Sequence, residues 1–155
     1  MTWPENVLDV MQPRFTAALP AYEQVRRPVR IEDPVQTLGL FVVDWNPTPD
    51  SYEISAAEPT LGRYIYRVQL MVRSAREEEA RTLYAQDTKV LRVVLYRDPD
   101  LLIPLQALSE EVLSVTERFK KMRVEGQRYM NNEVSGKYIC LSSTTVLVET
   151  ETAPT

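Results

Sequence analysis

The chain has 155 residues, of which 44% are hydrophobic and 26% are charged, and its formal net charge at pH 7 is −4. This length fits one domain with a hydrophobic core, and no run approaches the ~18 apolar residues of a membrane span. The absence of histidine excludes, within this chain, imidazole acid–base chemistry, His-containing zinc sites and Ser-His-Asp nucleophile systems. The negative net charge also disfavours a general attraction to nucleic acid phosphates.

The N-terminal part of the chain predicts a helix followed by an extended connector. Residues 6–19 place apolar side chains at helical steps, and Pro13 in their middle predicts a kink or two short helices. Residues 22–34 alternate charged residues with valine and isoleucine and contain two prolines, which favours an extended connector along the surface. The alternative for this segment is an arm that contacts a neighbouring subunit. Residues 1–5 lack the basic start and apolar block of a secretory signal, so folding in the cytoplasm is expected.

Residues 36–45 form an apolar block rich in β-branched and aromatic side chains, which indicates a buried strand or arm. The prolines within residues 46–50 predict a rigid turn after this block. Residues 52–54 add a further short extended piece. This part of the chain therefore predicts one buried strand that ends in a defined loop.

A strand signal then runs directly into a helix signal. In residues 64–72 the even positions are apolar, while the odd positions mix arginine with glutamine, isoleucine and methionine, which predicts a strand with one apolar and one basic, mixed face. Ser74 and Glu77 have the spacing of a capping box, and the neighbouring glutamates place negative charge at the positive end of a helix. An apolar stripe, interrupted by Asp87, continues to Asp98-Pro99. We expect a long helix lying across one face of a sheet.

The C-terminal part predicts two further strands. Residues 101–105 are a short apolar segment bounded by proline. Residues 112–129 alternate with a phase change near Lys120-Lys121, which predicts a bulge or bend, and Gly126 favours further bending. Asn131-Asn132 suggests a turn before the next strand.

Residues 136–149 form the last predicted strand by β-branched content and alternation, and they contain the only cysteine, Cys140. We interpret Cys140 as a buried small hydrophobic residue, because no histidine is present to activate it. Residues 1–151 are expected to form a single domain and residues 152–155 a short flexible tail. The predicted fold class is α+β, with a mainly antiparallel sheet backed by one long helix and an N-terminal helix, and with extended arms.

No pattern in the chain indicates an enzyme. The four glycines stand alone, so no phosphate-binding loop is present, and the helix dipole explains the run of glutamates at 77–79. No catalytic, cofactor-binding or metal-ligating residue is assigned, and no cofactor is expected.

The positions of the arginines indicate a candidate interaction surface. Arg63, Arg67 and Arg73 lie on one side of the central predicted strand, and arginines recur along a later one, so adjacent pairing of the two strands produces a cationic sheet face. That face is either solvated or a subunit interface, where arginine is enriched and glutamates of a partner can pair with it. The candidate interface residues are Arg63, Arg67, Arg73, Glu77, Glu78, Arg123 and Arg128.

Three stretches carry a resemblance to a known family: EPTL at residues 58–61, VQLMVRSAREEEA at 68–80 and RYMNNE at 128–133. With the order of predicted elements, they make residues 38–151 resemble the tail terminator proteins of long-tailed bacteriophages, especially those that infect actinobacteria. None of these stretches is a catalytic signature, so the resemblance is one of overall layout.

The resemblance implies a structural virion protein that forms a hexameric ring at the head-proximal end of the tail. Such a ring caps the tail tube protein, ends tube polymerisation and joins the tail to the head connector or stopper protein. It also implies that DNA passes through the ring without sequence recognition and that no membrane is involved.

Two alternatives stay open. One of them lies within the same class: another head–tail joining protein, such as a stopper or a tail completion factor. The other is a small α+β ligand-binding or enzymatic domain, for which Asp44, Tyr84 and Asp87 are the candidate polar residues. For the ring, we expect that reversing Arg67 or Arg73 to glutamate weakens assembly while the subunit stays folded.

Overall fold

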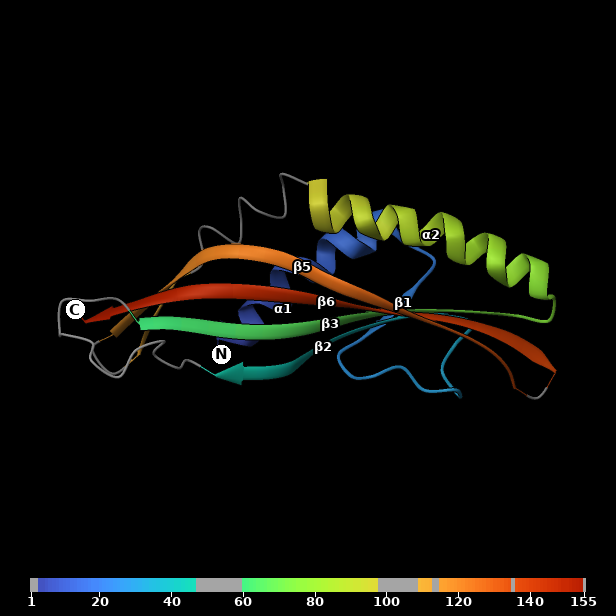
Figure 1. Ribbon diagram of the computed structural model, residues 1–155, viewed down its shortest axis with the longest axis horizontal. Coiled ribbons are helices and arrows are strands. Elements are labelled where there is room, and N and C mark those ends of the chain that lie inside the picture. The colour runs from blue at the N-terminus through green and yellow to red at the C-terminus, as the bar shows by residue number, and fades with distance from the viewer. Residues whose placement is uncertain (1–2, 47–59, 98–108, 113–114, 135, 155) are drawn as a thin grey trace.

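The computed structural model describes residues 3–46, 60–97, 109–112, 115–134 and 136–154 (Figure 1). The six strands form one sheet in the order β1-β2-β3-β6-β5-β4, in which β1 and β2 are parallel and the other pairs are antiparallel. This confirms the predicted α+β fold with a mostly antiparallel sheet. The elements in chain order are α1 (Trp3–Ala18), β1 (Glu23–Val25), β2 (Gln36–Asn46), β3 (Thr60–Ser74), α2 (Glu77–Arg97), β4 (Ser109–Val112), β5 (Val115–Val134) and β6 (Lys137–Pro154).

Three expected features fall outside the described residues: the turn after Asn46, the extended piece at 52–54 and the apolar segment at 101–105. Within the described part of the chain, no helix has the length and apolar character needed to cross a membrane.

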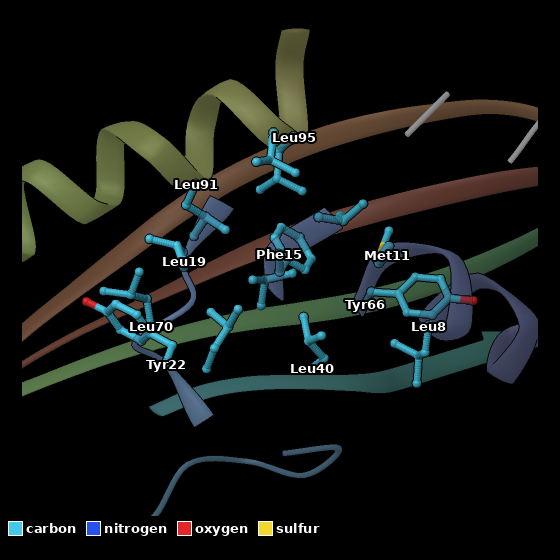
Figure 2. Close-up of a cluster of buried hydrophobic side chains, with 14 of the residues drawn as sticks. Leu8, Met11, Phe15, Leu19, Tyr22, Leu40, Tyr66, Leu70, Leu91 and Leu95 are labelled. Atoms are coloured by element: carbon cyan, nitrogen blue, oxygen red, sulfur yellow. The ribbon is translucent and has the colours of Figure 1, made fainter. Parts of the chain in front are cut away.

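The core lies between the sheet and the two helices, which pack on the same face. Tyr66, Val68 and Leu70 of β3 are fully buried, as the alternation in this strand predicts. Figure 2 shows these strand side chains meeting those of α1 and α2 in one cluster. The buried apolar side chains of the two helices are Val7, Leu8, Met11, Phe15, Ala80, Leu91, Val94 and Leu95.

Helix α1 is one continuous element of 16 residues with Pro13 inside it, so the expectation of two short helices is wrong. Proline removes one backbone donor and crowds the preceding turn. Here it lies on the exposed side of the helix, while Met11 and Phe15 on the other side are fully buried. Burial of that apolar stripe outweighs the single lost hydrogen bond.

Replacing Pro13 with alanine is therefore expected to stabilise the protein by about 1 kcal/mol, because alanine restores the backbone donor and suits a helix interior better. We expect a gain smaller than the full difference in helix propensity between alanine and proline, because proline also restricts the unfolded chain. Chemical denaturation followed by circular dichroism measures the change. A variant less stable than the wild type contradicts this account of α1.

Helix α2 begins at Glu77, and Ser74 caps it differently from the predicted capping box. The Ser74 hydroxyl accepts a hydrogen bond from the Arg76 amide at 3.2 Å and donates one to the Glu79 carboxylate at 3.2 Å, in place of the expected bond from the Ser74 amide to Glu77. The Ala80 amide donates to the Arg76 carbonyl at 3.1 Å, which makes Arg76 the first residue to accept a helical bond. Ala75 and Arg76 separate Ser74 from the start of α2, so the Ser74 side chain meets Glu79 and not Glu77.

The hairpin of β5 and β6 is the longest unit of the sheet, with strands of 20 and 18 residues. Its register shifts between Phe119 and Lys121, and again between Glu125 and Gln127, which confirms both predicted irregularities.

The predicted turn at Asn131-Asn132 is wrong, because both residues pair with β6 and the strand continues to Val134. The chain reverses between Val134 and Lys137, where Gly136 has a φ of 77°, a conformation that suits glycine. At the other end of β6, residues 152–154 pair with β5 and are not the flexible tail that was expected.

Candidate functional site

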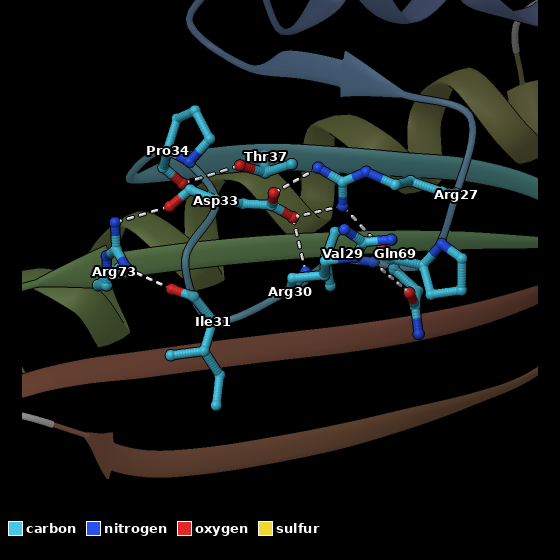
Figure 3. A network of polar contacts seen from close by, with 10 residues as sticks. Arg27, Val29, Arg30, Ile31, Asp33, Pro34, Thr37, Gln69 and Arg73 are labelled. Carbon is cyan, nitrogen blue, oxygen red and sulfur yellow. Dashed lines mark hydrogen bonds and ion pairs between the residues drawn. The ribbon is translucent and has the colours of Figure 1, made fainter.

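A segment of the chain crosses the face of the sheet opposite the helices (Figure 3). We call residues 26–35 the strap. The Val29 amide donates to the side-chain oxygen of Gln69 on β3 at 3.1 Å, and the Arg73 amide donates to the Val35 carbonyl at 2.9 Å. A Cβ on Gly39 of β2 would lie 2.8 Å from the Arg27 carbonyl oxygen, so the strap approaches the sheet at a distance that only glycine permits. The expected connector along the surface is therefore fastened to its own sheet.

Asp33 is the centre of the strap. It is only 4% exposed, and its carboxylate accepts hydrogen bonds from both terminal nitrogens of the Arg27 guanidinium and from the Arg30 amide. The two bonds to the guanidinium form the bidentate pairing that gives arginine–carboxylate contacts their specificity. The Arg27 side chain lowers the pKa of Asp33 to about 2, and the Arg30 amide contributes to the same shift.

This lowered pKa sets a pH dependence for stability. Between about pH 2 and the ordinary value of 3.8, the unfolded chain binds more protons at Asp33 than the folded chain does. The contribution of Asp33 is thus complete above pH 4 and is lost as the pH falls through about 2. We expect the urea midpoint of the wild type to fall more steeply between pH 4 and pH 2 than that of Asp33→Asn. Parallel curves for the two proteins contradict the assignment.

Arg73 fastens the other end of the strap. Its guanidinium donates to the Ile31 carbonyl at 2.5 Å and to the Asp33 carbonyl at 2.7 Å. These contacts join residues that are 42 and 40 positions apart in the sequence. Arg73 is therefore engaged within its own subunit.

The arginines do not form the adjacent pair of strands expected from the sequence, because β6 lies between β3 and β5. Arg67 is opposite Phe41 and Thr145 in register and is half-buried, with its Nε atom buried and without a hydrogen-bond partner. Arg123 is exposed on β5, opposite Leu147.

The remaining two arginines are placed by their backbone alone. Arg63 is opposite Glu149, and Arg128 is opposite Ser143. Whether this group of five arginines contacts another subunit stays a prediction.

The two acidic candidates lie in a different layer. Glu77 and Glu78 are exposed in the first turn of α2, which packs on the opposite face of the sheet from the strap. Glu77 pairs with Arg81 one turn later at 2.6 Å, an exposed ion pair that contributes little to stability. Within one subunit, these glutamates are not counterparts of Arg67 or Arg73.

The three candidate ligand-binding residues lie on two elements, Tyr84 and Asp87 on α2 and Asp44 on β2. Asp87 accepts a hydrogen bond of 2.5 Å from the hydroxyl of Tyr22, the buried first residue of the connector. Burial and this hydrogen bond raise the pKa of Tyr22 well above its usual range. Tyr84 is half-buried against the core, and Asp44 pairs with Ile65 in the backbone register of β2 and β3. The structure does not bring the three together at a described contact.

Two shallow depressions occur among the described residues. One lies beside Pro13 and Arg26, and the other lies at the start of α2 beside Arg76 and Leu83. The described residues hold no group of three or more cysteine, aspartate and glutamate side chains placed to bind a metal ion.

No protein-family model matches this chain, and no curated protein matches its sequence. Its fold and the layout of residues 38–151 are therefore the basis for proposing a function. The residues that reasoning from sequence missed are Asp33, Gln69 and Tyr22. The only signal for Asp33 was an acid placed among three arginines and next to a proline.

Proposed function

We propose that this chain is a structural subunit of a ring, the tail terminator of a long-tailed bacteriophage. In this role the ring caps the head-proximal end of the tail tube, ends tube polymerisation and joins the tail to the head connector. Six copies form the ring, and DNA passes through it without sequence recognition. The layout of residues 38–151, which resembles that family, supports the proposal.

The observation that carries the proposal is the shape of the sheet. Strands in globular proteins are usually 3–10 residues long, whereas β3, β5 and β6 have 15, 20 and 18 residues. The terminal strands of the sheet, β1 and β4, have only 3 and 4 residues. Among the described strands, β1 and β4 pair with only part of β2 and β5, so the rest of these two edges is open to a strand of a neighbouring copy.

Both faces of the same sheet are partly covered from within the chain. The helices pack on one face, and the strap lies on the other over Gly39 and Gln69. Such a double covering favours a rigid subunit, and a ring that ends a tube needs rigid subunits to close at a fixed number of copies.

The mass of the purified protein in solution, measured by light scattering and followed by negative-stain imaging, tests the proposal. We expect a mass of about six copies, or rings that appear once tail-tube protein is added. A protein that stays monomeric and never joins a tube contradicts the proposal. In that case, a small-molecule binding screen addresses the ligand-binding alternative.

A further inference from the structure

Strand β5 has a long outer edge in the described part of the chain. It has 20 residues, of which β4 pairs only with Val115–Arg118. From residue 119 to residue 134 its strand neighbour among the described residues is β6. Helix α2 packs on β3, β6 and α1, so its main contacts are elsewhere (Figure 1).

The hairpin turn determines which backbone groups point outward from this edge. Val134 pairs directly with Lys137, and Gly136 between them has a φ of 77°. In a hairpin with a two-residue turn the closing pair is hydrogen-bonded, and bonded and non-bonded pairs alternate from there. Asn132, opposite Ile139, therefore directs its N–H toward β6, whereas Asn131, opposite Cys140, directs its N–H away from β6.

The part of this edge nearest the turn is regular. Both register shifts of β5 lie before residue 127, so residues 127–134 pair with β6 without interruption. This stretch, QRYMNNEV, contains no proline and no glycine. A regular edge of this kind is a template onto which another strand can add through main-chain hydrogen bonds.

We propose that residues 127–134 of β5 pair with residues 40–46 of β2 from a second copy of this chain. The stretch of β2 is a partial edge as well, because β1 pairs only with Thr37, Leu38 and Gly39. The two edges lie at opposite ends of the sheet, so the contact is heterologous and repeats from copy to copy, as a ring requires. The inference rests on the proposed ring function and gives it an interface.

Symmetry favours β2 over a second β5 as the occupant. Residues 127–134 carry one basic and one acidic side chain, Arg128 and Glu133, so charge does not oppose the pairing of two β5 edges. Such a pair is isologous and stops at a dimer, whereas a contact between β5 and β2 joins two different edges and can repeat around a ring.

A pair of proline substitutions tests the edge, because proline removes a backbone donor wherever it stands. Asn131→Pro removes an outward N–H, which an edge strand tolerates, so the thermal midpoint should stay close to that of the wild type. Its mass by light scattering should fall to that of a monomer, under the condition in which the wild type assembles. Asn132→Pro removes an N–H bonded to β6, so its thermal midpoint should fall by several degrees.

A third variant tests the β2 side. Val43 is 47% exposed at the irregularity in β2, so Val43→Lys should stay folded while the added charge blocks strand pairing. Loss of assembly in both Asn131→Pro and Val43→Lys supports the interface. Loss in Asn131→Pro alone overturns β2 as the occupant and points to pairing between two β5 edges.

Three further outcomes would count against the inference, and they differ in what they leave standing. A wild-type ring together with an Asn131→Pro ring overturns the edge pairing and leaves the ring function standing. A thermal midpoint as low for Asn131→Pro as for Asn132→Pro overturns the outward direction of the Asn131 N–H. A wild type that never assembles overturns both proposals.

Discussion

Reversing Arg73 to glutamate is expected to lower the free energy of unfolding by about 3 kcal/mol, because two strap carbonyls lose their donor and face a carboxylate instead. The carbonyls are those of Ile31 and Asp33, which accept from the Arg73 guanidinium at 2.5 and 2.7 Å. Urea denaturation measures the loss of stability. Relative to the wild type, amide hydrogen exchange in the variant should accelerate more in the strap than in β6.

The matched control is Arg76→Glu. Arg76 is exposed and close in sequence to Arg73, and its backbone, not its side chain, makes the contacts at the start of α2. Its reversal should change stability by no more than about 0.5 kcal/mol. Equal stability of the Arg73 variant and the wild type would show that Arg73 does not hold the strap.

This prediction changes the mutational test of the ring. The sequence led us to expect that reversing Arg67 or Arg73 weakens assembly in a folded subunit. Because Arg73 fastens the strap, loss of assembly in its variant has two explanations, a displaced strap and a lost interface contact. The proline pair in β5 is the cleaner test.

Truncating Phe15 to alanine is expected to cost about 3–5 kcal/mol, the range measured for phenylalanine-to-alanine changes in well-packed cores. Phe15 has 0% exposure and is among the largest fully buried side chains. Figure 2 shows it in the middle of the cluster, between Leu95 of α2 and Leu40 of β2. Removing the ring leaves a cavity where both helices meet the sheet, and rigid neighbours cannot fill it completely.

Val93→Ala is the control for this core substitution. Val93 is also an apolar helical residue, but it is 55% exposed on α2. Its truncation removes little buried surface and improves helix propensity, so stability should change by less than about 0.5 kcal/mol. A Phe15→Ala variant as stable as Val93→Ala would place Phe15 outside the core. Thermal and urea unfolding of the three proteins provide the comparison.

Much of the fold is present in the sequence because it depends on local periodicity. The alternation around Tyr66 and Val68 predicted β3 and its buried face, and the stripe ending in Leu91 and Leu95 predicted α2. Side-chain direction repeats every two residues in a strand and about every 3.6 residues in a helix, so these patterns need no knowledge of the partner elements. The register shift near Lys121 was visible as a change of phase in this alternation, whereas the shift near Gly126 was expected from the glycine itself.

The tertiary structure alone decided the strand order, the course of the strap and the surroundings of each charged residue. Periodicity does not say that β6 separates β3 from β5, and it was this order that removed the expected pairing of two arginine-bearing strands. Nor does it show that Arg73 reaches a carbonyl 42 positions away. Such contacts depend on which distant segments the compact chain brings together, and local pattern does not encode that choice. The sequence by itself determined the longer elements and their buried faces, while the long-range packing determined the short strands β1 and β4 and which charges remain available to a partner.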